Sequence, residues 1–184
     1  IMYPTGYQTW VEVEAMTRPL EGAMRPTHFK GVTTVVAKLF NAIRPHTAYF
    51  GQKDAQQVAV IRQMVWDLNF PLEVVVCPTM READGLAMSS RNRYLEGEDR
   101  KAAVVLFQAL NAAKEAYQGG ERDAEMLRSR MKNVLEAETR AQIQYVSCAD
   151  YNTLEELEVI KGKALLSMAV LLGKTRLIDN FVLE

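Results

Sequence analysis

Cationic arginines and neighbouring hydroxyls occur together in residues 78–94, which read PTMREADGLAMSSRNRY. Arg91 can offer a planar, permanently charged fork to a phosphate, and Ser89 and Ser90 add hydroxyl donors beside it. Serine–arginine clusters are also common in polar linkers between domains, which is the alternative interpretation. The residue types favour a loop that holds phosphate groups.

A second polar group, FGQKDAQQ, occupies residues 50–57 directly after a short apolar stretch. The change predicts a strand-to-helix turn at Gly51, where backbone N–H groups and the helix dipole favour an anion. Lys53 adds a positive charge there, and Gln57 lies one helical turn further on, which predicts that both side chains reach one cavity. The alternative is that Asp54 only caps the helix while Lys53 and Gln57 lie in solvent.

Helices and strands alternate through the first part of the sequence. Thr27 is a predicted N-cap for a helix that ends before Pro45, with apolar positions 29, 32, 36, 39, 40 and 43 on its buried face. Strands are predicted at 47–50 and 72–77, the second buried on both faces, with a helix between them that carries apolar positions 58, 61, 65 and 68. A further half-buried strand is predicted at 10–13. This order indicates the end of a doubly wound α/β domain, whose ligands lie beyond the carboxyl ends of its strands.

Beyond Thr79 the pattern changes to helices followed by consecutive strands. Helices are predicted at 98–117, ending at a pair of glycines, and at 123–137. Three strands follow, at 142–149, 163–172 and 176–183, which predicts an α+β unit with a three-stranded antiparallel sheet. We therefore predict a partial Rossmann-like nucleotide-binding domain in residues 1–79 and a smaller α+β lid domain in residues 80–184.

The composition excludes several classes of function. A net charge of −1 and a pI near 6.2 argue against nucleic acid as the main partner, because such proteins carry a basic excess. The longest apolar stretch, residues 164–172, is too short to cross a membrane and is predicted to be a buried strand. No secretory signal is visible, so a cytoplasmic location is expected. Cys77 and Cys148 lack Cys-x-x-Cys spacing and are expected to be buried thiols, and no metal-ligand cluster appears.

Together with residues 25–32, RPTHFKGV, these segments resemble the pantothenate synthetase family. Its members are ATP-dependent ligases that join pantoate to β-alanine, and the resemblance runs from Tyr3 to the last residue. It implies that the carboxylate of pantoate attacks the α-phosphate of ATP, and that the amine of β-alanine then displaces AMP from the adenylate. The protein supplies alignment and charge neutralisation, with Mg²⁺ on the phosphates.

The resemblance also implies a role for each matching residue. Lys53, Ser89, Ser90 and Arg91 would be catalytic, and pantoate and β-alanine would be bound by Gln57, His28 and Arg25. The implied ATP-binding set is Gly51, Lys53, Asp54, Met80, Met88, Ser89, Ser90 and Arg91. Met80 stands where relatives commonly have a small aliphatic residue near adenine. A homodimer or higher oligomer is expected.

One part of the family pattern has no counterpart here. Members begin with a nucleotide-binding half that carries a His-x-Gly-His signature, whereas this sequence contains only His28 and His46. The sequence opens on Ile1, and we expect it to be the C-terminal part of a longer protein and inactive alone. Two alternatives remain. A related nucleotidyltransferase would lack Gln57 and residues 25–28, and a non-catalytic folded fragment would turn nothing over.

Overall fold

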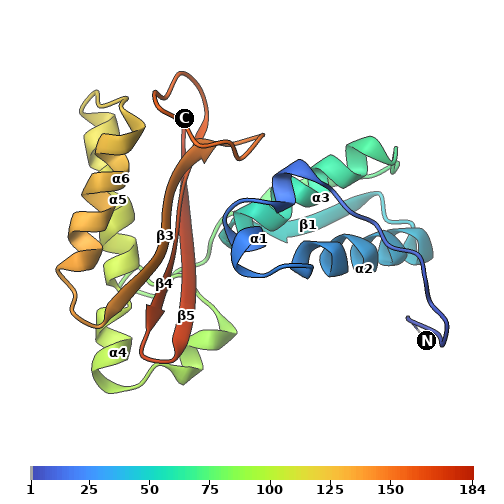
Figure 1. The fold of residues 1–184 in the computed structure, drawn as a ribbon, viewed down its shortest axis with the longest axis horizontal. Coiled ribbons are helices and arrows are strands. Elements are labelled where there is room, and N and C mark those ends of the chain that lie inside the picture. The colour runs from blue at the N-terminus through green and yellow to red at the C-terminus, as the bar shows by residue number, and fades with distance from the viewer. Residues whose placement is uncertain (1) are drawn as a thin grey trace. The chain divides into compact units, whose positions relative to one another are not determined.

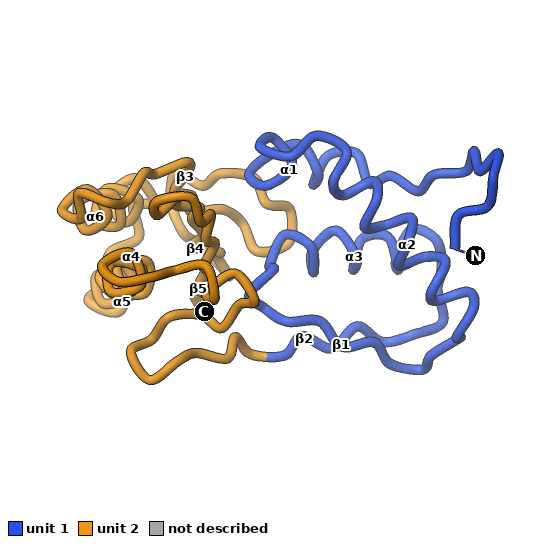
Figure 2. Tube along the Cα trace, turned by 90° about the horizontal axis from the view of Figure 1, so that it is seen from below, with its two compact units in different colours: residues 1–77 blue, residues 78–184 orange. Residues whose placement is uncertain are grey.

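The computed structural model describes residues 2–184, and Ile1 lies outside the described residues. The chain divides into two compact units, residues 1–77 and residues 78–184 (Figures 1 and 2). Each unit has its own sheet, so each is described by itself.

Unit 1 is built around a two-stranded parallel sheet. Thr47 of β1 lies opposite Glu73 of β2, and the register continues to Gly51 opposite Cys77. The predicted alternation of helix, strand, helix and strand is confirmed. Its elements are the 3₁₀ helix η1 (Ala15–Thr17), α1 (Glu21–Met24), α2 (His28–Ile43), β1 (Thr47–Gly51), the 3₁₀ turn η2 (Gln52–Asp54), α3 (Ala55–Asp67) and β2 (Glu73–Cys77).

Helices α2 and α3 lie on the same side of this sheet (Figure 2). The Phe40 ring of α2 contacts the rings of Phe50 and Phe70, with centroids 6.5 and 5.5 Å apart. The residues of β2 are half-buried or exposed, so the prediction that this strand is buried on both faces was wrong. The reason is that, within residues 2–77, both long helices cover one face only.

The buried face of α2 differs from the predicted one. Leu39 and Ile43 were expected inside but are 38% and 68% exposed. Thr27 occupies the N-cap position with a φ of 68°, and its side chain makes no capping hydrogen bond. The face that is buried consists of Phe29, Thr33, Thr34, Ala37 and Phe40.

The two buried threonines explain a second error, at residues 10–13, which form no strand. The Thr33 hydroxyl donates to the backbone carbonyl of Val11 at 2.6 Å, and the Val11 N–H donates to the Thr34 hydroxyl at 3.0 Å. Side chains of α2 thus satisfy the backbone groups that a neighbouring strand would otherwise bind.

Unit 2 packs two long helices on one face of a three-stranded antiparallel sheet (Figure 1). Apolar residues of α5 and α6, among them Leu106 and Leu127, share one core with Leu166 and Met168 of the central strand. The apolar stretch that was predicted to be a buried strand is this central strand. The elements are η3 (Ser90–Tyr94), α4 (Gly97–Ala102), α5 (Val105–Gln118), α6 (Ala124–Glu136), β3 (Ala141–Asp150), β4 (Ala164–Leu172) and β5 (Thr175–Leu183).

The helix boundaries of unit 2 follow local signals in two cases and lack them in a third. Gly120 has a φ of 103° just after α5, and Asp123 caps α6 by accepting a hydrogen bond from the Met126 N–H. The single helix predicted over 98–117 is instead two helices, α4 and α5, because the chain turns between Ala102 and Val105. Between residues 2 and 184, the structure contains no helix with the length and apolar character needed to span a membrane.

Candidate active site

The end of β1 carries the predicted anion-binding turn in unit 1. Gly51 is the last residue of β1, and η2 places Lys53 and Asp54 directly after it. The Lys53 Nζ lies 3.8 Å from a carboxylate oxygen of Asp54, and only 20% of the Lys53 side chain is exposed. Asp54 stands at the N-cap position of α3, yet its side chain accepts no capping hydrogen bond. The alternative that Asp54 merely caps the helix and Lys53 lies in solvent is therefore not supported.

Gln57 lies in the first turn of α3 and is half-buried. The prediction that Gln57 lies one helical turn beyond Lys53 was wrong, because Lys53 belongs to the separate 3₁₀ turn η2. The two side chains come from consecutive elements at the carboxyl end of β1. Their proximity along the chain, rather than helical spacing, brings them to the same end of the sheet.

Sequence reasoning overlooked the neighbouring Gln56, which is one of the few buried polar residues of unit 1. Its carboxamide oxygen accepts a hydrogen bond from the Glu21 N–H, and its amide donates to the carbonyls of Met16 and Pro19, each at 2.9 Å. A signal was present, because Gln56 stands one and two helical turns before the buried Val60 and Met64. A polar residue on an apolar stripe needs buried partners.

The segment held by Gln56 carries Arg25 and His28. Arg25 is exposed after the end of α1, and His28 is half-buried at the start of α2, with its ring centroid 5.1 Å from that of Phe29. The Arg25 N–H donates to the Glu21 carbonyl at 2.9 Å, and the His28 N–H donates to the Arg25 carbonyl at 3.1 Å. The two predicted substrate-binding residues are thus joined to each other through the backbone.

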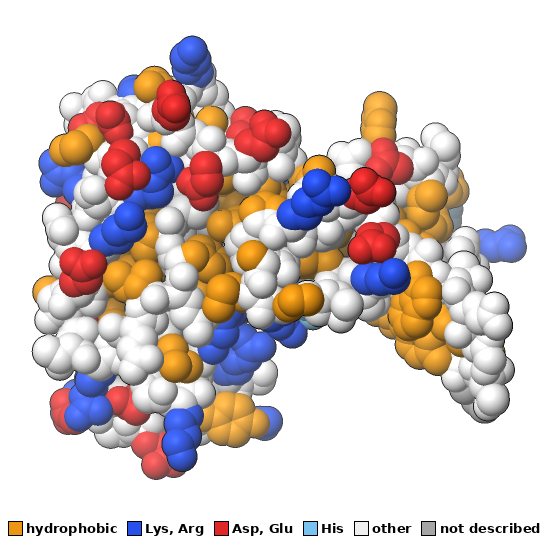
Figure 3. Space-filling model, in the orientation of Figure 1, with side chains coloured by type: hydrophobic (Ala, Val, Ile, Leu, Met, Phe, Trp, Pro, Cys, Tyr) orange, Lys and Arg blue, Asp and Glu red, His pale blue; other side chains and the backbone are white. Residues whose placement is uncertain are grey.

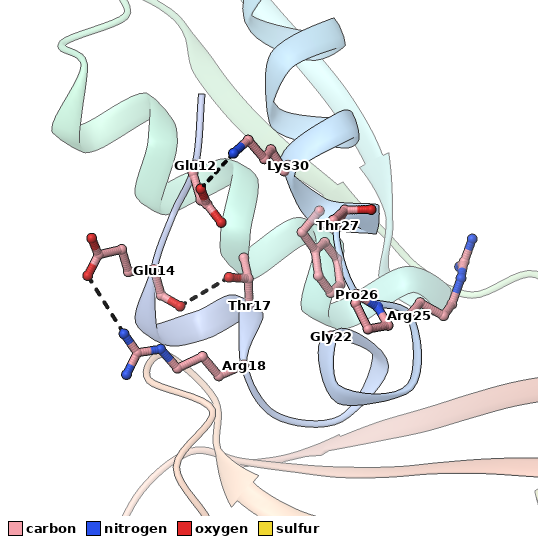
Figure 4. A pocket seen from close by; sticks show the side chains of 10 residues that line it. Glu12, Glu14, Thr17, Arg18, Gly22, Arg25, Pro26, Thr27 and Lys30 are labelled. Atoms are coloured by element: carbon pink, nitrogen blue, oxygen red, sulfur yellow. Dashed lines mark hydrogen bonds and ion pairs between the residues drawn. The ribbon is translucent and has the colours of Figure 1, made fainter. Parts of the chain in front are cut away.

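A cavity of about 440 Å³ lies beside this segment (Figure 4). Ion pairs between Glu12 and Lys30, at 3.2 Å, and between Glu14 and Arg18, at 3.8 Å, stand at its wall. The guanidinium of Arg25 points away from the other labelled side chains (Figure 4). The structure therefore does not gather Arg25 with His28 or Gln57 in this cavity, whose lining is Glu12, Glu14, Thr17, Arg18, Gly22, Arg25, Pro26, Thr27, Phe29 and Lys30.

In unit 2, residues 80–88 form a tight hairpin that carries the two predicted ATP-contacting methionines. Arg81 and Ala87 form an antiparallel bridge, and the Met88 N–H donates to the Met80 carbonyl at 2.9 Å. Both methionine side chains are exposed, at 70% and 55%. Gly85 forms the tip with a φ of 94°, and a Cβ there would collide with the ring of Phe107. The hairpin therefore brings Met80 and Met88 together at its open end.

The serine–arginine segment follows the hairpin directly. Ser89 is extended, and its hydroxyl accepts a hydrogen bond from the Arg91 N–H at 3.2 Å, which caps η3. Ser90 is exposed and Arg91 is half-buried. The structure thus places Met80, Met88, Ser89, Ser90 and Arg91 on one continuous hairpin and turn.

Arg81 anchors this hairpin and was not recognised in the sequence as a functional or structural residue. Its guanidinium donates to both carboxylate oxygens of Asp179 on β5, at 2.6 and 2.9 Å, and to the Gly85 carbonyl at 2.9 Å. The rings of Phe107 and Phe181 lie 4.9 and 5.1 Å from the guanidinium carbon. Only 1% of the Asp179 side chain is exposed, so the pair is a buried, bidentate link.

A second ionic group fixes the hairpin to α4. Arg100 donates to Glu82 and to Asp84, each at 2.7 Å, and the Asn92 amide donates to Glu82 at 2.8 Å. Hydrogen bonds from Asn92 and then Arg100 hold the pKa of Glu82 below its ordinary value, and the hydrogen bond from Arg100 lowers the pKa of Asp84. The same contacts raise the pKa of Arg100. Both carboxylates are therefore ionised at neutral pH.

The described residues offer few ligands to a divalent metal ion. Within residues 2–184 no group of three or more histidine, cysteine, aspartate or glutamate side chains could hold a metal ion. Asp54 is the carboxylate beside the predicted phosphate site. A single carboxylate fits Mg²⁺ that is held mainly by phosphates and water.

The predicted site residues fall in both units. Lys53, Asp54, Gln57, Arg25 and His28 belong to unit 1, whereas the methionines, serines and Arg91 belong to unit 2. The distances and hydrogen bonds given above therefore describe each group within its own unit.

The family model described as pantoate-beta-alanine ligase matches residues 1–182. The chain belongs to the pantoate-beta-alanine ligase family. The relatives include the pantothenate synthetases of Roseiflexus sp. (strain RS-1) and Moorella thermoacetica, which are 58% and 54% identical to it over 183 residues. Those alignments cover 100% of this chain and 66% and 65% of the relatives, so the chain spans just under two thirds of their length.

Solved structures agree with this family membership. A pantothenate synthetase from Thermus thermophilus matches with a TM-score of 0.94 and 45% identity, over 98% of this chain and 65% of that one. A pantoate-beta-alanine ligase from Francisella tularensis, described as complexed with beta-gamma ATP and beta-alanine, matches with a TM-score of 0.71 and 33% identity, over 98% of this chain and 60% of that one. The resemblance drawn from residues 25–32, 50–57 and 78–94 is confirmed at the level of the family.

Proposed function

We propose that this chain supplies part of the active site of an ATP-dependent ligase that joins pantoate to β-alanine. The observation that carries the proposal is the match of the pantoate-beta-alanine ligase family model to residues 1–182. The hairpin and serine–arginine turn of unit 2 and the lysine turn at the end of β1 support it, because each offers cations and hydroxyls to phosphate. The Francisella relative, complexed with beta-gamma ATP and beta-alanine, supports ATP and β-alanine as substrates.

The chemistry requires no protein nucleophile. One carboxylate oxygen of pantoate forms a bond to the α-phosphorus of ATP while the bond to the departing pyrophosphate breaks, giving pantoyl adenylate. The amine of β-alanine then attacks the acyl carbon, loses a proton and expels AMP, leaving the amide. The catalytic role proposed for Lys53, Ser89, Ser90 and Arg91 is to stabilise negative charge on the phosphates as it develops.

The remaining site residues are assigned to binding. Gln57, His28 and Arg25 would contact pantoate and β-alanine. Gly51, Asp54, Met80 and Met88 complete the proposed ATP site, with both methionines offering exposed apolar surface to adenine. Mg²⁺, when bound with ATP, would neutralise phosphate charge, and Asp54 is the residue that would hold it.

We propose that residues 1–79 belong to a Rossmann-like, doubly wound nucleotide-binding domain, and that residues 80–184 form its lid. The parallel pairing of β1 with β2 supports the first assignment, because such sheets bind ligands at their carboxyl ends. Lys53 and Asp54 follow that end of β1. A cytoplasmic location suits an enzyme that uses ATP.

An assembly of two or more copies is proposed from the surface of unit 1. Apolar side chains gather on the N-terminal segment (Figure 3), where Tyr3 and Trp10 are 41% and 51% exposed. Tyr49 of β1 is 68% exposed as well. Exposed apolar patches of this kind favour association.

The direct test is synthesis by the complete ligase that contains these residues. Purified protein is mixed with ATP, Mg²⁺, pantoate and β-alanine, and AMP, pyrophosphate and pantothenate are quantified together. The proposal expects equal amounts of all three. Pyrophosphate without pantothenate would indicate a related nucleotidyltransferase, and no product at all would contradict the proposed function.

A further inference from the structure

Gln56 binds a backbone N–H at the start of α1 that no neighbouring capping side chain binds. The first residue of α1, Glu21, follows Leu20, which provides no side-chain cap and has a φ of 53° with ψ at −122°. The Glu21 N–H is instead satisfied by the carboxamide oxygen of Gln56, 35 residues further along the chain. A side chain of α3 thus starts a helix to which it does not belong.

The backbone turn that Gln56 contacts, residues 16–22, is constrained by further hydrogen bonds and by close packing. Its amide donates to the carbonyls of Met16 and Pro19, and the Pro19 carbonyl also accepts the Gly22 N–H at 3.0 Å. A Cβ at Gly22 would collide with the Thr17 carbonyl oxygen. The positive φ of Leu20 is a costly conformation for a residue with a side chain, and it persists only where its surroundings hold it.

Backbone hydrogen bonds carry this restraint from Gln56 to the proposed substrate residues. Gln56 holds the Glu21 N–H, the Glu21 carbonyl accepts the Arg25 N–H, and the Arg25 carbonyl accepts the His28 N–H. Gln57, the third proposed substrate residue, is the next residue after Gln56 on α3. One buried carboxamide therefore links the three positions.

We propose that Gln56 is a positioning residue for the pantoate and β-alanine side of the active site. It does not touch substrate, because its oxygen and its amide are engaged by the 16–21 backbone and the residue is only 5% exposed. It holds Arg25 and His28 at fixed places relative to Gln57. This proposal rests on the proposed function for its kinetic consequence but not for its structural one.

The test uses Gln56→Met, which keeps the length of the side chain and removes its hydrogen bonds, and Gln56→Glu, which keeps the acceptor and removes the donors at neutral pH. The matched control is Gln63→Met on the same helix, where the side chain bonds only Asp67 in an exposed position. In the complete ligase, both Gln56 variants should raise the KM for pantoate and for β-alanine about tenfold, because buried hydrogen bonds to the turn are lost, three in Gln56→Met and two in Gln56→Glu. The KM for ATP should change less than about twofold, and Gln63→Met should match the unsubstituted enzyme.

Amide hydrogen exchange on the same proteins separates this proposal from the proposed function. Gln56→Met should accelerate exchange at Glu21, Arg25 and His28 while α3 stays protected, whether or not the protein joins pantoate to β-alanine. Gln56→Glu should give a smaller change at Glu21, whose acceptor is retained. Unchanged exchange at the three amides would overturn the positioning role. An equal rise in all three KM values would also overturn it, since that result indicates general destabilisation.

Discussion

Lys53 is the residue to which we assign the largest part of the proposed phosphate chemistry. Its ammonium lies 3.8 Å from Asp54 and is largely shielded from solvent, so its charge acts in a poorly screened setting. We expect Lys53→Ala in the complete ligase to lower the rate of adenylation by two to three orders of magnitude, since a positioned cation stabilises such a transition state by about 3–4 kcal/mol. Pyrophosphate release with pantoate and ATP measures this step.

The control for that experiment is Lys161→Ala, which removes an exposed lysine from unit 2. It should keep the full rate of pyrophosphate release. A loss below tenfold in Lys53→Ala would remove Lys53 from the catalytic residues.

The two cysteines should differ sharply in reactivity. Cys148 is fully buried in β3, and burial raises the pKa of its thiol to about 11. At pH 7.5 less than about one molecule in a thousand then carries the reactive thiolate. Cys77 is half-buried at the end of β2.

We expect iodoacetamide to label Cys77 first, with Cys148 modified only on unfolding, as read by peptide mass spectrometry over time. In Cys77→Ser the native protein should take up almost no label. Comparable labelling of both thiols in the native state would contradict the burial of Cys148.

At the scale of elements, the hairpin 80–88 depends on the link between Arg81 and Asp179. Removing one partner leaves the other as an uncompensated buried charge, which costs about 3–5 kcal/mol. We expect Arg81→Met to lower the free energy of unfolding of unit 2 by that amount, measured from the slowest-exchanging amides of β4. The double variant Arg81→Met/Asp179→Leu should recover most of the loss, because no lone charge remains.

Arg93→Met is the matched control, because Arg93 lies in η3, just after the hairpin, and its guanidinium stacks on Tyr94 in an exposed position. It should leave β4 exchange unchanged. Additive losses in the Arg81 and Asp179 variants would show that the two residues do not act as a pair.

The Glu82, Asp84 and Arg100 group makes unit 2 sensitive to acid. Because the folded pKa of each carboxyl lies below its unfolded pKa, the stabilisation is fully present above the unfolded values and is lost as pH falls through the folded ones. We expect the melting temperature of unit 2 to fall as pH drops below roughly 4. Arg100→Met should lower the melting temperature at pH 7 and flatten this dependence.

Lys101→Met, which removes the adjacent cation and its exposed pair with Glu98, should keep most of the pH dependence. A steep acid transition that survives in Arg100→Met would assign the sensitivity to other carboxylates.

The elements that sequence could predict are those with local signals. The strands of unit 2 read as apolar or alternating runs, and Asp123 and Gly120 mark helix boundaries. The break between α4 and α5 carries no glycine or proline and was missed. Residues 10–13 alternate like a strand, yet the hydroxyls of α2 take their backbone hydrogen bonds.

The candidate site divides in the same way. Lys53 and Ser89–Arg91 could be proposed from the sequence because lysine, serine and arginine side chains can bind phosphate. Arg81 could not be identified, and Gln56 could be recognised only as a polar residue on an apolar stripe, because their partners lie 98 and 35 to 40 residues away along the chain. Such pairs are created by tertiary folding and leave little trace in a single sequence.

At the scale of the whole molecule, the chain spans 66% of the length of its Roseiflexus relative, and the ligase reaction needs a complete nucleotide site. We expect residues 1–184 alone to form no pantothenate, while the part from about Met80 onward stays folded. The sheet of unit 1 is expected to associate through its exposed apolar residues, which light scattering would detect.

Supplying, as a separate polypeptide, the part of the relatives' length that this chain does not span should restore turnover, measured as AMP formation. The control is that polypeptide alone, which should be inactive. Full activity from residues 1–184 by themselves would show that the chemistry or its location has been misjudged.

The partnership of Arg81 with β5 also concerns how the protein is made. Asp179 is translated 98 residues after Arg81, so the hairpin leaves the ribosome well before the strand that anchors it. Until β5 has emerged, Arg81 lacks its carboxylate partner Asp179 and has only the Gly85 carbonyl and the Phe107 ring as partners. A chain released before that strand would encode every residue of the proposed phosphate-binding loop and still lack the Arg81–Asp179 link, leaving the contacts of Arg100 with Glu82 and Asp84 to hold the hairpin.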